Sequence, residues 1–257
     1  MQKNFIFSDT ETTGLREKDF IQIIQSASIL TDESFETIDT QMIESRPLPW
    51  VVPLPGSYLV HKKIATLDSN TSHYQMMRDI YDTWEKWSDN KQSIFVTYNG
   101  HQFDEELYRR QFYWNLLPPY ITNTNGNGRS DLYFLILLVS YLYPDFIKFN
   151  MNNYDLPILK LDQILPKIGI DVSDAHDALT DCKFMVHLIK HIYPEHSDLV
   201  KDFFLQATKA SFIDMLYTRN YFGFIQRGPR YRFIYPLTFI CQNPESPNKA
   251  IFLDLSY

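Results

Sequence analysis

The pattern of apolar and polar residues predicts that strands come first and that strands and helices then alternate. Short apolar runs, each ended by a polar turn, predict strands over residues 4–9, 21–32, 37–45 and 93–100. Apolar residues at helical spacing predict helices over residues 73–88, 104–116, 156–170 and 176–193, and a buried helix in the apolar run from Leu132. Segment 46–56 carries four prolines and is expected to be extended and irregular. This order predicts an α/β or α+β sheet with helices on its faces.

Composition limits the class of protein without naming a function. The 257 residues, 44% of them hydrophobic, suffice for one large domain, alone or with a small extension. Cys182 and Cys241 lie far apart and offer no zinc motif, which favours a reducing cytoplasm over a disulfide scaffold. The apolar run after Lys3 is too short for a signal peptide, and the run from Leu132 is too short for a membrane span. We therefore expect a cytoplasmic protein without a membrane segment.

Charge is divided unevenly along the chain. Residues 1–196 hold 17 Lys and Arg against 26 Asp and Glu, a net charge of −9, whereas residues 197–257 hold 7 against 5, a net charge of +2. The acid excess argues against a protein that coats nucleic acid. It does not exclude action on phosphates, because metal ions held by carboxylates invert the local charge.

Two carboxylates, Asp9 and Glu11, follow the apolar strand of residues 4–9 directly. Residues two apart on a strand point to the same side, so the two charges are expected to repel, and one would normally be protonated. The pair is either a solvated strand end or, because hard divalent cations prefer oxygen ligands, part of a metal site. The pair alone does not decide between these interpretations.

Two later stretches carry further candidates. Asp104 stands after a predicted strand and turn at the start of a helix, and taken alone it is typical of a helix N-cap. Asp181 lies about 60° from the centre of the apolar stripe of its helix, so its carboxylate flanks the buried face and needs a partner or a metal. His176 stands five residues earlier, where a lone histidine is usually polar surface.

The three stretches together resemble a known family. "SDTETTGL", "YNGHQFDEEL" and "HDALTD" resemble, in order, the three motifs of the DEDD 3′→5′ exonuclease superfamily in its histidine-containing subclass, DEDDh. Longer blocks resemble the bacterial exonuclease I family over about residues 4–196, and "FIYPLTFICQNPESPNKAIFLDL" resembles the start of its SH3-like domain. The resemblance implies a ribonuclease H-like mixed sheet flanked by helices in a domain of residues 1–196. Residues 197–257 would form a short extension, a helix plus a small β region. Chains of that family are much longer.

The resemblance also implies roles for individual residues. Four acids would hold two Mg²⁺ ions, for which Mn²⁺ can substitute: Asp9, Glu11, Asp104 and Asp181. Asp9 would bridge both ions, and His176 would be the general base that takes the proton of water. The terminal nucleotide would contact the turn from Thr12 and Thr13 to Leu15, and further contacts would come from Asn99 and Phe103.

The expected function is metal-dependent 3′→5′ hydrolysis of single-stranded DNA to nucleoside monophosphates. A 3′→5′ exoribonuclease on short RNA, or a nucleic-acid-binding module with reduced catalysis, remains the alternative, because no motif reads the sugar 2′-hydroxyl. Protein partners are not predicted. Cations among aromatic rings in residues 197–257 suggest a surface that tracks a single strand, or a solvated helix followed by a small sheet. The cations are Lys201, Lys209, Arg219, Arg227, Arg230 and Arg232.

Overall fold

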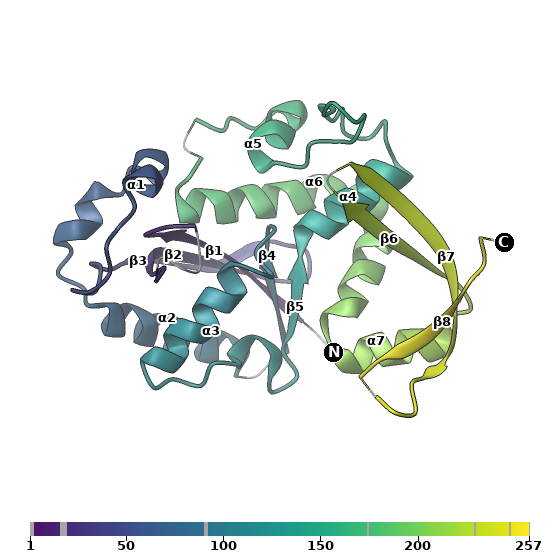
Figure 1. Cartoon of the computed structure of the whole chain (residues 1–257), viewed down its shortest axis with the longest axis horizontal. Helices are drawn as coiled ribbons and strands as arrows, with labels where there is room; N and C mark the ends of the chain where they lie inside the picture. The colour runs from purple at the N-terminus through teal and green to yellow at the C-terminus, as the bar shows by residue number, and fades with distance from the viewer. Residues whose placement is uncertain are drawn as a thin grey trace.

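A five-stranded mixed sheet forms the centre of the computed structural model, which describes residues 3–15, 20–89, 92–173, 175–228, 230–246 and 248–256. The strand order is β3-β2-β1-β4-β5, with β1 antiparallel to β2 and parallel to β4. The strands are β1 (Asn4–Thr12), β2 (Ile23–Thr31), β3 (Thr37–Glu44), β4 (Ser93–Thr97) and β5 (Gly128–Asp131). The α/β fold expected from the sequence, a mixed sheet flanked by helices, is confirmed (Figure 1).

Helices cover both faces of this sheet. Helices α2 (His73–Ser88) and α3 (Asp104–Trp114) lie on one face, and α4 (Leu132–Leu142) and α6 (Ala178–Phe204) lie on the other. Two shorter helices, α1 (Pro55–His61) and α5 (Leu161–Ile164), belong to the connecting segments. Because side chains alternate along β1, Phe7 packs into the core with α4 and α6, whereas Ile6 packs into the core with α2 and α3. Figure 1 shows α6 above the sheet and α2 and α3 below it. None of the helices in the described ranges is long and apolar enough to cross a membrane.

Three predicted segments differ from the observed elements. The helix expected over 156–170 is wrong in extent: it is the single turn α5 followed by a 3-10 turn, Leu165–Ile168, which begins next to Pro166. The helix expected over 176–193 begins at Ala178 and continues to Phe204, with a kink at His196 two residues after Pro194. The irregular segment 46–56 ends early, because Pro55 starts α1 at a position where a missing N–H costs nothing.

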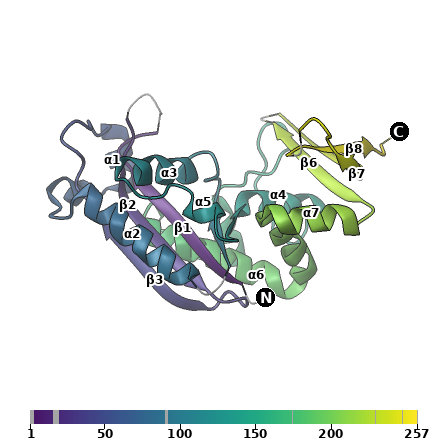
Figure 2. The same ribbon diagram turned by 90° about the horizontal axis from the view of Figure 1, so that it is seen from below.

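The C-terminal part forms a separate layer at one end of the molecule. Beyond α6 lie α7 (Lys209–Thr218) and an antiparallel sheet of β6 (Phe222–Gly228), β7 (Tyr231–Gln242) and β8 (Ala250–Asp254). This C-terminal sheet and α1 stand at opposite ends of the molecule (Figures 1 and 2). Helix α6 runs past residue 196, the end of the predicted first domain, to Phe204.

Candidate active site

The first motif lies at the end of β1, in the middle of the sheet. Asp9 and Glu11 stand two residues apart and pair in register with Ala27 and Gln25 of β2. Burial raises the pKa of Glu11 to about 8, and the Asp181 carboxylate adds to the shift. Burial also raises the pKa of Asp9 well above its ordinary value, with further contributions from nearby carboxylates. At both acids of this strand, burial and neighbouring carboxylates therefore disfavour the charged form.

Asp104 joins these acids from the first turn of α3. It is the first residue of that helix and follows the cap Phe103, so its carboxylate does not cap the helix. The Thr10 hydroxyl donates to it instead. A Cβ at Gly100 would lie 2.6 Å from Asp104 Oδ2, so a glycine is needed for this close approach. Burial raises the pKa of Asp104 to about 6, although the Thr10 hydrogen bond opposes the shift.

The third motif closes the cluster from the start of α6. Asp181 lies in the first turn of the helix, and His176 lies two residues before the helix with a left-handed φ of 69°. One ligand atom each of Glu11, His176 and Asp181 lies within 4.8 Å of the others. Burial raises the pKa of Asp181 to about 6, against the opposing effect of His176. A strand, a loop and a helix thus bring three predicted residues into one place.

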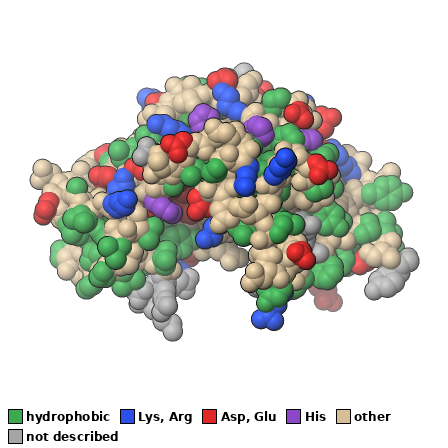
Figure 3. Space-filling model, turned by 90° about the horizontal axis from the view of Figure 1, so that it is seen from above, with side chains coloured by type: hydrophobic (Ala, Val, Ile, Leu, Met, Phe, Trp, Pro, Cys, Tyr) green, Lys and Arg blue, Asp and Glu red, His purple; other side chains and the backbone are tan. Residues whose placement is uncertain are grey.

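A cavity of about 590 Å³ opens beside this cluster. Asp9, His176 and Asp181 line it on one side, and Tyr133 and Arg227 line it on another. Figure 3 shows a face that is hollowed between the end carrying α1 and the end carrying β6–β8, with acidic, histidine and basic side chains around the hollow. The C-terminal sheet therefore contributes a wall to the candidate site.

The turn after β1 is held by its own side chains. The Thr12 hydroxyl donates to the Gly14 carbonyl at 2.7 Å, and the Thr13 hydroxyl accepts from the Gln22 backbone N–H at 2.9 Å. Leu15 is 74% exposed. The two hydroxyls are therefore engaged within the turn, and Leu15 is the side chain of this predicted group that is open to a ligand.

The two remaining predicted contacts differ in position. Asn99 lines the cavity in a left-handed conformation, φ 56°, and its backbone N–H donates to Asp131 Oδ1 at 2.6 Å. Phe103 caps α3 and packs against the core that contains Trp84. Phe103 is not among the described residues that line the cavity. The structure thus brings Asn99, but not Phe103, to the cavity wall.

Sequence reasoning missed several residues around the cluster. Lys63 forms an ion pair with Asp177, the residue that follows His176, and Gln25 also donates to Asp177. Arg227, by contrast, is one of the cations predicted from the sequence, and it reaches the cavity from β6. Asp177 has a usable signal, because an aspartate just before a helix is a typical N-cap. No local sequence pattern marks Lys63 or Gln25, since their partner Asp177 is far away in the sequence.

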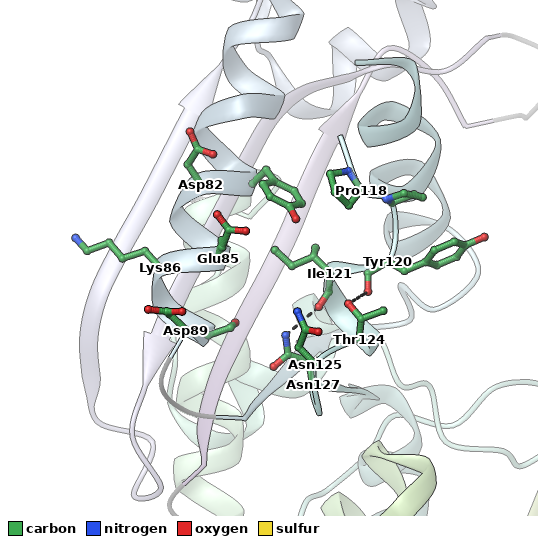
Figure 4. A pocket seen from close by; sticks show the side chains of 13 residues that line it. Asp82, Glu85, Lys86, Asp89, Pro118, Tyr120, Ile121, Thr124, Asn125 and Asn127 are labelled. Atoms are coloured by element: carbon green, nitrogen blue, oxygen red, sulfur yellow. Dashed lines mark hydrogen bonds between the residues drawn. The ribbon is translucent and has the colours of Figure 1, made fainter. Parts of the chain in front are cut away.

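A second hollow, of about 840 Å³, lies between the end of α2 and residues 118–127. Asp82, Glu85 and Asp89 contribute acids to it, all of them exposed. Figure 4 shows Asp82, Lys86 and Asp89 pointing out from α2, away from Ile121. None of the predicted site residues is among its described lining residues.

Comparisons with known proteins agree with the motifs. No family model matches the chain. It is 30% identical over 236 residues to exodeoxyribonuclease I of Buchnera aphidicola from Acyrthosiphon pisum, covering 86% of this chain and 56% of that protein. It is 25% identical over 271 residues to exodeoxyribonuclease I of Escherichia coli K12, covering 99% of this chain and 54% of that protein. The chain thus spans about half the length of the curated relatives it matches.

Solved structures show the same fold. The structure of E. coli exonuclease I in complex with a dT13 oligonucleotide matches with a TM-score of 0.81 and 23% identity, over 99% of this chain and 55% of that one. Exonuclease I from Methylocaldum szegediense matches with a TM-score of 0.80 and 22% identity, over 99% and 55%. The resemblance that the motifs predicted is confirmed: this chain is exonuclease I-like in sequence and fold, and it corresponds to about half of those proteins.

Proposed function

We propose that this chain is a metal-dependent 3′→5′ exonuclease that hydrolyses single-stranded DNA to nucleoside monophosphates. The observation that carries the proposal is the convergence of Glu11, His176 and Asp181 within 4.8 Å, in the same cluster of acids as Asp9. The named relatives are exodeoxyribonucleases, and several of the matched structures hold single-stranded oligonucleotides. The division into a nuclease domain of residues 1–196 and an extension of residues 197–257 is part of the same proposal.

The donor set fits hard divalent cations. Asp9, Glu11, Asp104 and Asp181 offer carboxylate oxygens, which Mg²⁺ and Mn²⁺ prefer as ligands. Burial raises the pKa of all four acids, and neighbouring carboxylates add to each shift, while Lys63 opposes it at Glu11 and His176 opposes it at Asp181. We therefore assign the cluster to two Mg²⁺ ions, with Mn²⁺ able to substitute. When bound, such ions neutralise these acids and supply charge stabilisation for phosphodiester hydrolysis.

The chain's own groups would do three things. The His176 imidazole, exposed at the cluster, would take a proton from the attacking water. The turn from Thr12 to Leu15 would receive the 3′ nucleotide, with Leu15 against the last base. Tyr133 and Arg227, which also line the cavity, would contact the nucleic acid upstream.

The two free cysteines, buried Cys182 and half-buried Cys241, suit action in the cytoplasm.

One assay tests the proposal. Single-stranded DNA and RNA of equal sequence, labelled at the 3′ or the 5′ end, are incubated with the chain, with and without EDTA. We expect 3′-labelled DNA to release labelled mononucleotide at once, 5′-labelled DNA to shorten progressively, and EDTA to stop both reactions. Faster cleavage of RNA would instead indicate an exoribonuclease. Binding without cleavage at any Mg²⁺ or Mn²⁺ concentration would indicate a nucleic-acid-binding module.

A further inference from the structure

Lys63 lies outside the three motifs, yet its ammonium group reaches the start of α6. Its Nζ donates to Asp177 Oδ2 at 2.5 Å, and the two side chains are 19% and 30% exposed. Asp177 follows His176 directly, and its Oδ1 accepts the Thr180 backbone N–H at 3.1 Å, so it is the N-cap of α6. The ion pair therefore fixes Asp177, the residue between His176 and the helix that carries Asp181.

Gln25, on strand β2 of the sheet, also binds Asp177. Its Nε2 donates to Asp177 Oδ2 at 3.2 Å and to Glu44 Oε1 at 2.8 Å, and its Oε1 accepts the Ala178 backbone N–H at 3.0 Å. Gln25 is buried and pairs in register with Glu11 on the neighbouring strand. The start of α6 is thus fixed to the sheet on one side and to Lys63 on another.

The segment that carries Lys63 is itself tied to the turn after β1. The Leu54 backbone N–H donates to the Thr13 carbonyl at 2.8 Å. The Lys63 backbone N–H donates to His61 Nδ1 at 3.0 Å, so Nδ1 is an acceptor and the Nε2–H donates to the Thr12 carbonyl at 3.2 Å. Lys63 therefore joins the turn proposed for the 3′ nucleotide to the loop that carries the proposed base.

We propose that Lys63 is a positioning residue, whose ion pair with Asp177 holds His176 and Asp181 in place against Glu11. The three ligand atoms within 4.8 Å come from a strand, a loop and a helix, so their spacing depends on ties between those elements. Groups that hydrogen-bond a metal ligand orient that ligand, and Lys63 would act one residue further away, through Asp177. The inference rests on the proposed function for what the cluster does.

A competing role for Lys63 is purely electrostatic. Burial and the Asp181 carboxylate raise the pKa of Glu11, and the Lys63 ammonium opposes them, so Lys63 also offsets part of the negative charge of the cluster. The two roles predict opposite effects on cation binding. Removing a nearby positive charge strengthens the binding of a cation, whereas removing a positioning group weakens it.

Mn²⁺ binding to the full chain, measured by electron paramagnetic resonance at fixed pH, separates the two roles. We expect Lys63→Met to weaken Mn²⁺ binding roughly tenfold or more, the range for groups that orient metal ligands. Lys63→Arg keeps the ion pair and should bind Mn²⁺ within about threefold of the wild type. Lys62→Met is the matched control, because Lys62 is the adjacent, exposed lysine, and it should leave the affinity unchanged.

The nuclease assay gives the second readout. Lys63→Met should lower kcat roughly tenfold or more, with KM for a short oligonucleotide within about threefold of the wild type. Lys63→Gln removes the charge and shortens the side chain, so it should show the same loss, and it replaces Lys63→Met if the latter melts at assay temperature. Unchanged or tighter Mn²⁺ binding in Lys63→Met, or an equal loss in Lys62→Met, would overturn the inference. A wild-type chain that binds Mn²⁺ but cleaves nothing would refute the proposed function, while the Mn²⁺ comparison would still decide the role of Lys63.

Discussion

Two regions of this molecule gather carboxylates beside a hollow, and they differ in what surrounds the charges. At the end of β1, Asp9 and Glu11 are half-buried, and burial raises the pKa of both. At the end of α2, Glu85 and Asp89 are exposed, and Asp82 is exposed and forms an ion pair with Arg78 at 3.0 Å. Water stabilises the second group of charges but not the first.

The comparison shows that neither acid content nor size identifies a site. The hollow at α2 is the larger of the two, about 840 Å³ against about 590 Å³, and it has as many acids around it. Clustered buried carboxylates are costly unless a cation neutralises them, whereas exposed ones need no partner. The cost carried by the first group is therefore the feature that points to bound metal.

The largest expected effect follows from removing single acids. Asp9→Asn, Glu11→Gln, Asp104→Asn and Asp181→Asn should each lower exonuclease activity about 10³-fold or more, because each removes a ligand of ions that supply most of the charge stabilisation. Glu85→Gln, in the exposed group, should stay within about twofold of the wild type. Shortening of 5′-labelled single-stranded DNA measures both. An active variant among the four would remove that residue from the site.

Loss of the proposed base should cost less than loss of a ligand. His176→Ala should lower turnover on the order of 10²-fold, as expected for a missing general base, and the chain should remain folded. Adding free imidazole should restore part of the rate in His176→Ala and leave Asp9→Asn inactive. Wild-type turnover in His176→Ala would make the histidine a surface residue, like the exposed acids of α2.

The pH dependence of stability should also differ between the two regions. The pKa of Glu11 rises from 4.5 to about 8 in the folded state, so its contribution to stability is full below pH 4.5 and is lost as pH rises toward 8. Metal-free protein should therefore melt at a lower temperature at pH 8 than Glu11→Gln, by roughly 2–5 °C, whereas Glu85→Gln should match the wild type. Mg²⁺ should remove the difference.

Comparing variants separates the effect of Glu11 from that of groups whose contribution to stability changes with pH in the opposite direction. Burial lowers the pKa of His73 to about 4, so its contribution to stability is lost as pH falls from 6.5 toward 4. Since His73 is the same in all three proteins, its effect cancels. Equal melting temperatures of metal-free wild type and Glu11→Gln at pH 8 would contradict the prediction that ionised Glu11 destabilises the metal-free fold.

Local signals made some of these features predictable from sequence. Helix α2 occupies residues 73–88 as predicted, because its apolar spacing is regular and the Ser72 hydroxyl caps it by accepting from the Gln75 N–H. Asp9 and Asp104 are recognisable because each stands at the end or start of an element, and Asp181 because it flanks the apolar stripe of its helix. Their convergence was inferred from the order of the motifs, which the family resemblance made specific.

Long-range contacts made the rest unpredictable. Lys63 and Gln25 meet Asp177 across 114 and 152 residues, and nothing in the adjacent sequence marks them. Helix α6 extends beyond residue 193 because Val200 and Phe204 pack into the core next to Phe5, a tertiary contact that outweighs the local break at Pro194. Such contacts depend on the whole fold and leave no periodic pattern.

The smallest expected effect concerns the cations of the C-terminal sheet. Arg219 is paired with Asp202 at 2.6 Å, whereas Arg227 and Arg230 lie over the rings of Tyr133 and Tyr154 at 5.7 and 5.5 Å. Arg227 Nη2 donates to the Pro157 carbonyl at 2.8 Å, and its buried Nη1 has no acceptor among the described residues. Arg232 was also predicted as a strand-tracking cation, but its side chain is not among those that the structure describes. Arg227 and Arg230 are therefore the candidates for binding phosphate at the C-terminal sheet.

Charge reversal at these two positions tests whether the extension tracks a strand. Arg227→Glu with Arg230→Glu should shorten each run along long single-stranded DNA and spare cleavage of very short oligonucleotides. The slope of log affinity against log salt should become shallower by about 0.7 for each phosphate that the protein no longer neutralises. Lys86→Glu, beside the exposed acids of α2, is the matched control and should change neither run length nor slope. An equal decrease on long and short substrates would show that the extension does not track the strand, and the protein would then be a nuclease that clears short oligonucleotides with the same acid cluster.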